Sequence, residues 1–193
     1  MARSSPWEGL TYRPIPAPDG EVRALFGFVG AWAPQDSAVD SGWGAWAGDR
    51  LIGALLLEKS GSAGMLHGPV VVAPGGEPAA EGVMPAAAGD RASPTSPAAA
   101  ETTDAAEAIE VAAHLLADAL AHAGTRSIDT LFTRPQGLDP VWVRLGFIPV
   151  PEVELPRGLR GRPGVGLFAW RGGTALWSSA ARNAVPAASR SRR

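Results

Sequence analysis

The chain has 193 residues, a formal net charge of −2 and no cysteine, and 46% of its residues are hydrophobic. This length suits one domain, because single cores usually take about 100 to 200 residues, and the apolar fraction is enough for a sizeable core. The lack of cysteine excludes disulfides, thiolate metal sites and cysteine nucleophiles. The near-neutral charge gives no broad attraction for nucleic acid, which needs Lys and Arg clustered on one face.

The residues that follow Met1 to Trp7 do not form the continuous apolar stretch of a secretory signal. No window of the sequence reaches the roughly 18 uninterrupted apolar residues of a membrane helix. We therefore expect a soluble, cytoplasmic protein with no membrane partner and no specific nucleic-acid partner.

The N-terminal part is predicted to hold a strand, a helix and then further strands. Residues 10–15 suit a short strand, and apolar residues at three- and four-residue spacing over 22–32 predict an amphipathic helix. The apolar runs 43–47 and 51–57, separated by a Gly-Asp-Arg turn, predict a hairpin. A further run, 65–72, ends in consecutive valines and is typical of a strand covered on both faces.

Residues 74–103 are crowded with Pro, Gly, Ala, Ser and Thr and have no regular period, which predicts a long, flexible, low-complexity insert. After this insert, Asp104 and Glu107 have the spacing of a capping box. A helix is therefore predicted to begin at Asp104. It should end at Ala123, because Gly124 can take the left-handed conformation that terminates helices.

The C-terminal part is expected to contain a strand, a short helix and two more strands, at residues 127–133, 138–145, 147–150 and 165–170. The short helix should end at Gly146. Together these elements predict a single domain over 8–172. The remaining residues, 173–193, show little periodicity and are expected to form a disordered or frayed tail.

The segment Val141 to Phe147, with the sequence VWVRLGF, lies between two of the predicted strands. It looks like the Tyr-x-x-x-Gly-Phe segment of the GNAT superfamily of acyl-CoA-dependent N-acyltransferases. The order of elements over residues 10–170 is also similar to that family. The resemblance implies an α/β fold with a mixed, mostly antiparallel central sheet of about six to seven strands, flanked by helices.

In that family the pantetheine arm of the cofactor lies between the fourth and fifth strands, where their backbones separate. The matching stretches here are 67–72 and 127–133. The resemblance therefore implies that acetyl-CoA or a related acyl-CoA is bound by residues of these two stretches and of the VWVRLGF segment, namely His67, Val70, Val71, Val72, Leu131, Thr133 and Trp142.

The sequence departs from the family's pattern at two places. The glycine-containing turn that holds the cofactor's pyrophosphate has no counterpart before the long helix. Four acidic residues are instead expected to surround the start of that helix, where they would repel a phosphate, namely Glu101, Asp104, Glu107 and Glu110. Trp142 stands where the family places a tyrosine that acts as an acid, and an indole N–H does not release its proton.

Glu58, at the end of the third strand, and His67, within the fourth, are the nearest candidates for a catalytic base. The alternatives are a solvated strand end for Glu58 and a buried, hydrogen-bonded histidine for His67. No metal site is expected. The His and Asp residues of the long helix suit a solvated face, and the arginines over 157–162 suit either a solvated connection or a basic rim for an anionic ligand.

The resemblance implies an N-acyltransferase that moves an acetyl or related acyl group from CoA to an amine of a small molecule or a protein, and it also allows a homodimer. The alternative is a catalytically inactive relative whose scaffold binds a protein or peptide partner. In a third version, residues 74–103 fold over the ligand as a lid.

Overall fold

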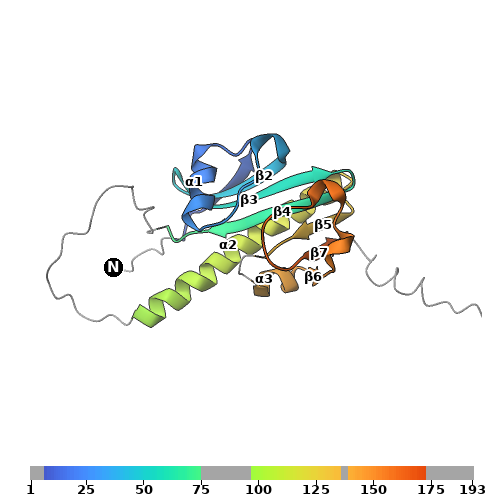
Figure 1. The fold of residues 1–193 in the computed structure, drawn as a ribbon. Helices are drawn as coiled ribbons and strands as arrows, with labels where there is room; N and C mark the ends of the chain where they lie inside the picture. Colours follow the sequence, from blue (N-terminus) through green and yellow to red (C-terminus); the bar gives the residue numbers. More distant parts are fainter. Residues whose placement is uncertain (1–6, 75–96, 136–138, 173–193) are drawn as a thin grey trace, which may run out of the picture.

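The computed structural model describes residues 7–74, 97–135 and 139–172. At its centre is a seven-stranded sheet in the order β1-β2-β3-β4-β5-β7-β6 (Figure 1). β4 and β5 pair in parallel, whereas the other neighbouring strands are antiparallel. The mixed, mostly antiparallel α/β sheet expected from the sequence is therefore confirmed.

The strands are β1 (Thr11–Ile15), β2 (Val39–Ala47), β3 (Arg50–Ser60), β4 (Ala63–Val71), β5 (Thr130–Thr133), β6 (Ile148–Pro149) and β7 (Phe168–Arg171). The α-helices are α1 (Gly20–Phe28), α2 (Pro97–Thr125) and α3 (Asp139–Arg144), and short 3-10 turns lie at η1 (Asp36–Ala38), η2 (Glu152–Glu154) and η3 (Arg157–Leu159). The predicted order of elements is confirmed over these residues, although the last two strands are shorter than predicted.

Helix α1 begins at an aspartate cap, where the Asp19 side chain accepts hydrogen bonds from the main-chain N–H of Glu21 and of Val22, both at 3.1 Å. The sequence predicted a helical run to residue 32, but the helix ends at Phe28. Gly30 has a φ of 69°, in the left-handed region that stops a helix. Trp32 therefore lies outside α1 and is exposed rather than part of its buried face.

Helix α2 begins at Pro97, and the predicted start at Asp104 is wrong. The stretch that opens with Pro97 is rich in alanine, and proline at the first helical position followed by alanine favours a helix. At the other end, Ser127, with a φ of 54°, takes the left-handed conformation predicted for Gly124, and the helix ends at Thr125. The predicted insert therefore overlaps the helix, and its remaining part, like the predicted tail, lies outside the described residues.

The N-terminal turns of α2 project beyond the sheet (Figure 1). The first described side chain of this helix that is buried is Val111. At 1.5 Å per residue, Pro97 lies about 20 Å farther along the helix axis than Val111. The second half of α2 packs on the sheet, where a Cβ added to Gly53 of β3 would lie 3.3 Å from Val111.

The two faces of the sheet are covered differently. Helix α2 covers one face, and helix α1 covers part of the other. Beside α1, on that other face, a smaller apolar cluster lies beneath the connection between β6 and β7. It is made of Ala63, Met65, Phe132, Leu155, Leu159, Leu167 and Ala169. The connection therefore takes the place of a covering helix over the first halves of β4 and β5.

Candidate functional site

Strands β4 and β5 run side by side only over part of their length. Their ladder begins at Ala63 and Thr130 and ends at Leu66 and Thr133, where β5 stops. The Thr133 hydroxyl closes this end by donating a hydrogen bond to the Leu66 carbonyl at 3.3 Å. Strand β4 continues to Val71, and over 67–71 it has no partner strand on this side among the described residues. We call this stretch of unpaired β4 edge the β4–β5 opening.

A bulge in β4 lies within the β4–β5 opening. His67 pairs with Leu56 and Val70 pairs with Ala54, so Gly68 and Pro69 oppose a single residue of β3. Since Ala54 and Leu56 share one face of the sheet, His67 and Val70 also share that face although they are three residues apart. Gly68 has a φ of 94°, and a Cβ added there would lie only 2.8 Å from the Ala54 carbonyl oxygen. The site therefore requires glycine.

Three polar side chains meet beside the bulge. His67 Nε2 lies 3.2 Å from Oε2 of Glu58, which extends from the same face of β3. Arg162, from the connection between β6 and β7, donates from Nε to the same Oε2 at 2.9 Å and from Nη2 to Oε1. The Glu58 and His67 side chains are both buried, and Arg162 is three-quarters buried. The predicted pair is thus brought together, with an arginine that bridges both oxygens of the glutamate.

Burial and the paired charges set the protonation of this group. Burial raises the pKa of Glu58, but the hydrogen bonds and charge of Arg162, helped by His67, outweigh it and leave that pKa below its ordinary value. Burial lowers the pKa of His67 to about 4, against the opposing effect of Glu58. At neutral pH, Glu58 is therefore a carboxylate and His67 a neutral imidazole.

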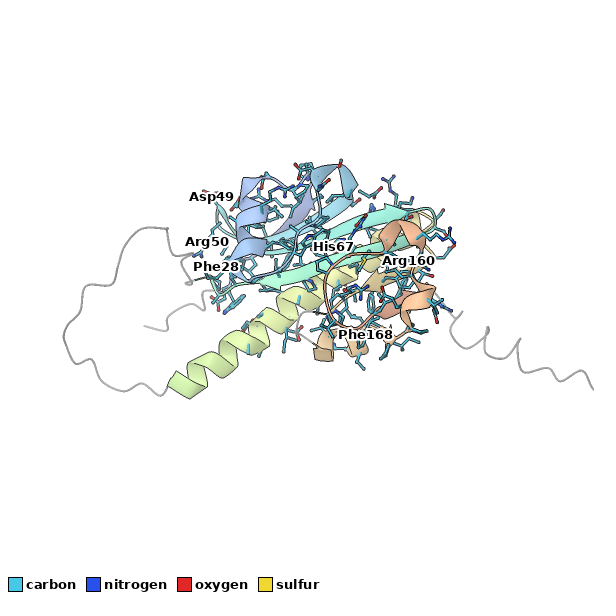
Figure 2. All side chains as sticks on the ribbon, viewed as in Figure 1. Phe28, Asp49, Arg50, His67, Arg160 and Phe168 are labelled. Atoms are coloured by element: carbon cyan, nitrogen blue, oxygen red, sulfur yellow. The ribbon has the colours of Figure 1, made fainter. Side chains whose placement is uncertain are left out.

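The hydrogen bond to Glu58 determines which nitrogen of His67 carries the proton. A carboxylate can only accept, so Nε2 must donate, and Nδ1 then has the free lone pair. The Trp32 ring lies edge-on to the imidazole, with ring centroids 5.1 Å apart, and 37% of Trp32 is exposed. His67 sits on β4 between α1 and the connection that carries Arg160 (Figure 2).

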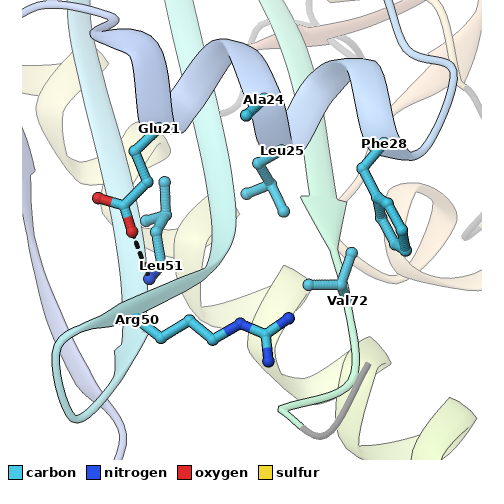
Figure 3. Close-up of a pocket in the computed structure, with 7 residues that line it drawn as sticks. All are labelled: Glu21, Ala24, Leu25, Phe28, Arg50, Leu51 and Val72. Carbon is cyan, nitrogen blue, oxygen red and sulfur yellow. Dashed lines mark hydrogen bonds between the residues drawn. The ribbon is translucent and has the colours of Figure 1, made fainter. Parts of the chain in front are cut away.

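Beyond the bulge, the same face of β4 leads to a pocket of about 140 Å³ beneath α1. Its wall is mainly apolar and includes Leu25, Phe28 and Val72 (Figure 3). Glu21 closes one side by accepting a hydrogen bond from the Leu51 N–H at 2.9 Å. Val72, one of the residues expected to contact a cofactor, thus faces a hollow, and Val70 is buried next to it along the strand.

Comparison with solved structures identifies the architecture. An acetyltransferase from Streptococcus agalactiae 2603 superposes with a TM-score of 0.54 at 8% identity, covering 85% of this chain and 99% of that one. N-acetylglutamate synthase from Neisseria gonorrhoeae, complexed with coenzyme A and N-acetyl-glutamate, gives 0.51 at 14% identity, covering 83% of this chain and 35% of that one. The chain has a GNAT-like fold.

An acetyltransferase of the GNAT family from Staphylococcus aureus Mu50 is also similar, with a TM-score of 0.49 and 10% identity over 83% of this chain and 99% of that one. The GNAT-like chain spans about a third of the length of N-acetylglutamate synthase. No family model matches the sequence, and no curated protein matches it. The similarity of this chain to the solved structures is therefore a similarity of fold.

One feature of this GNAT-like chain suits an extended ligand, namely the unpaired edge of β4 in the β4–β5 opening. Trp142 of α3, one of the residues expected to contact a cofactor, is 1% exposed, and its Nε1 is a buried donor without a hydrogen-bond partner in the described part of the chain. The predicted acidic cluster at the helix start is wrong, because the first turn of α2 has no acidic residue and Glu110 lies well inside the helix, paired with Arg144 at 3.1 Å.

Other predicted residues lie elsewhere in the GNAT-like fold. Leu131 and Thr133 are fully buried within the β4–β5 ladder, at the closed side of the opening. The histidines of α2 diverge, because His114 stacks on Tyr12 while His122 lies 3.1 Å from the Ser41 hydroxyl.

Within the described ranges, no group of three or more His, Cys, Asp or Glu residues could hold a metal ion. No helix of those ranges is long and apolar enough to cross a bilayer.

Sequence reasoning missed Trp32, and it placed Arg162 in a basic rim or a solvated connection without predicting its pairing with Glu58. Both come from connections, and Arg162 lies 104 residues from Glu58. One signal was present: Glu58 follows an apolar run in β3, and a buried carboxylate needs a cationic partner. Of the other arginines of this region, Arg160 donates to the Leu155 carbonyl, and Arg171 of β7 pairs with Glu154.

Proposed function

We propose that this chain is an N-acyltransferase that transfers an acetyl or related acyl group from acyl-CoA to an amine. The observation that carries this proposal is the juxtaposition of the β4–β5 opening with His67, a neutral imidazole at the first residue of the opening. An unpaired strand edge provides main-chain N–H and C=O groups for an extended ligand. A base beside that edge is the further requirement for acyl transfer to an amine.

The main chain of residues 67–71 would hold the pantetheine amides, and the side chains of Val70, Val72 and Trp142 would line the ligand. When bound, the cofactor supplies an acyl group already activated as a thioester. The protein's own task is then to position the amine and to remove its proton.

His67 is the proton acceptor in this proposal, and Glu58 is not. Both carboxylate oxygens of Glu58 are taken up by Arg162, so this carboxylate is not free to receive the proton of the amine. His67 keeps a lone pair at Nδ1, available at any pH above about 5 because its pKa is about 4. Glu58 is a positioning residue that fixes the tautomer and the ring, and Arg162 in turn fixes Glu58.

Turnover can be measured without a background signal from protein thiols because the chain has no cysteine. A thiol reagent such as DTNB then reports only the CoA thiol released when acyl-CoA reacts. We expect thiol release with acetyl-CoA or a short-chain homologue in the presence of at least one member of a panel of primary amines, amino acids and peptides. Absence of thiol release together with absence of acyl-CoA binding would overturn the proposed activity.

The role of His67 is tested by His67→Gln, with His114→Gln as the matched control on an exposed helix face. Loss of a general base typically costs about 10² to 10⁴ in rate. We expect a drop of that size in kcat for the first variant and an unchanged kcat for the second. An H67Q enzyme with the wild-type kcat would remove His67 from the mechanism.

A further inference from the structure

The end of helix α1 and the residues after it expose large apolar side chains to solvent. Seven large hydrophobic residues are exposed among the described residues, and three of them, Phe28, Val29 and Trp32, lie within one short segment. Phe28 is 49% exposed and Trp32 is 37% exposed. Exposed apolar side chains gathered in one place mark interaction sites or ligand-binding grooves. We call these three residues the α1 patch.

The α1 patch connects His67 with the pocket beneath α1. At one end of the patch, the Trp32 ring lies edge-on to the His67 imidazole, with ring centroids 5.1 Å apart. At the other end, Phe28 belongs to the wall of the pocket, together with Ala24 and Leu25 (Figure 3). The pocket and His67 share one face of β4, whereas the acyl-CoA is proposed to lie along the edge of that strand. This face is therefore left for the second substrate, the amine.

The pocket suits an apolar group of about the size of one benzene ring. Its volume is about 140 Å³, close to the roughly 150 Å³ of an apolar protein cavity that accepts benzene. The two charged residues of its lining already bond main-chain groups, since Glu21 accepts from the Leu51 N–H and Arg50 donates to the Pro74 carbonyl, both at 2.9 Å. Their charges are opposite, so the lining does not favour a charged group of either sign.

The register of β3 and β4 sets the distance between the base and the pocket. His67 pairs with Leu56, and the Val72 N–H donates to the Ile52 carbonyl at 2.8 Å. Four residues of β3 separate these partners (56 − 52), so His67 lies about 13 Å from Val72, which lines the pocket, at roughly 3.3 Å per residue. A ring in the pocket must therefore be joined to an amine at His67 by an extended arm.

We infer that the acceptor is a primary amine whose far end carries a benzene-sized apolar group, and that this group binds in the pocket beneath α1 while the amine reaches His67. This inference rests on the proposed function and names the class of its acceptor. The arm of the amine crosses the α1 patch. Phe28 is thus a specificity-determining residue and takes no part in the proton transfer.

The test compares kcat/KM for phenylalkylamines of increasing arm length, from benzylamine to phenylhexylamine, with kcat/KM for amino alcohols of the same arm lengths. Thiol release from acetyl-CoA is the assay. Ala24→Leu fills the pocket from an exposed position of α1, and Phe28→Ser removes an apolar side chain from its wall. Val153→Ser is the matched control, because Val153 is 77% exposed and lies in η2. All three positions are exposed, so the substitutions leave the core intact, and the rates with amino alcohols check the fold of each variant.

We expect the wild type to prefer the phenylalkylamines by about 10- to 100-fold once the arm spans the distance to the pocket, which corresponds to the burial of one aromatic side chain. Ala24→Leu and Phe28→Ser should each reduce this preference by about 3-fold or more without changing the rates with amino alcohols, and Val153→Ser should retain it. Thiol release with equal kcat/KM for the two series would overturn the inference and leave the proposed function intact, as would a preference that both pocket variants retain or one that is largest for benzylamine. Absence of thiol release with every amine, together with absence of acyl-CoA binding, would overturn both.

Discussion

The buried imidazole of His67 should make the protein progressively less stable between pH 6.5 and pH 4. Burial lowers the pKa of His67 from 6.5 to about 4 in the folded chain, whereas in the unfolded chain the pKa keeps its ordinary value. Above pH 6.5 the ring is neutral in both states, so the full stability is present. As the pH falls, the unfolded chain takes up the proton first, and the equilibrium shifts toward unfolding.

The size of this effect follows from the two pKa values. A difference of one pH unit in pKa is worth about 1.4 kcal/mol, so the interval from 6.5 to about 4 corresponds to a total of about 3 kcal/mol. About 2 kcal/mol of this should be lost between pH 7.5 and pH 5. Glu58, whose pKa is lowered, adds a further loss in the same direction at more acidic pH.

The assay is urea unfolding followed by tryptophan fluorescence, carried out at pH 7.5 and at pH 5. His67→Gln is the informative variant, because its amide can still donate to Glu58 but does not titrate. The free energy of unfolding of the wild type should fall by about 2 kcal/mol more than that of H67Q over this interval. The exposed control His114→Gln should behave as the wild type. Equal losses for the wild type and H67Q would refute the assignment of a buried neutral imidazole.

Two other substitutions test the bulge of β4 and the Arg162–Glu58 ion pair by the same unfolding measurement. Gly68→Ala should destabilise the fold by more than Gly61→Ala. Gly61 also has a positive φ, but open space surrounds it, so the Gly61→Ala substitution costs only about 1 kcal/mol of backbone strain. Equal losses of stability for the two variants would show that β4 shifts away from the Ala54 carbonyl. Arg162→Ala leaves the Glu58 carboxylate buried without its partner and should cost about 3 kcal/mol at pH 7 and less at pH 4, where that carboxylate can be protonated. A cost independent of pH would contradict the ion-pair role.

Much of the fold could be predicted because its signals are local. The hairpin of β2 and β3 and the buried β4 are visible as apolar runs divided by turn residues, and Gly146, with a φ of 86°, ends α3 as expected. The start of α2 was predicted wrongly for a local reason as well. The capping-box spacing of Asp104 was given more weight than the alanine-rich stretch before it, whose helix propensity extends the helix back to Pro97.

The site could be predicted only in part. Glu58 and His67 are conspicuous as titratable residues within apolar strands, and their pairing follows from the register of β3 and β4. Arg162 and Trp32 lie in irregular connections, where neither period nor spacing indicates which strand they will meet. Their positions depend on how the connections cross the sheet, which is a property of tertiary packing and not of the local sequence.

The central claim is that the edge of β4 beyond Leu66 holds an extended acyl-CoA. Backbone amide NMR during a titration with acetyl-CoA tests it most directly, because main-chain N–H groups that acquire an acceptor change their chemical shifts. We predict that the largest saturable shifts occur within residues 67–71, except Pro69, which has no N–H. No saturable shift at millimolar acetyl-CoA, or shifts confined to residues remote from β4, would contradict the claim.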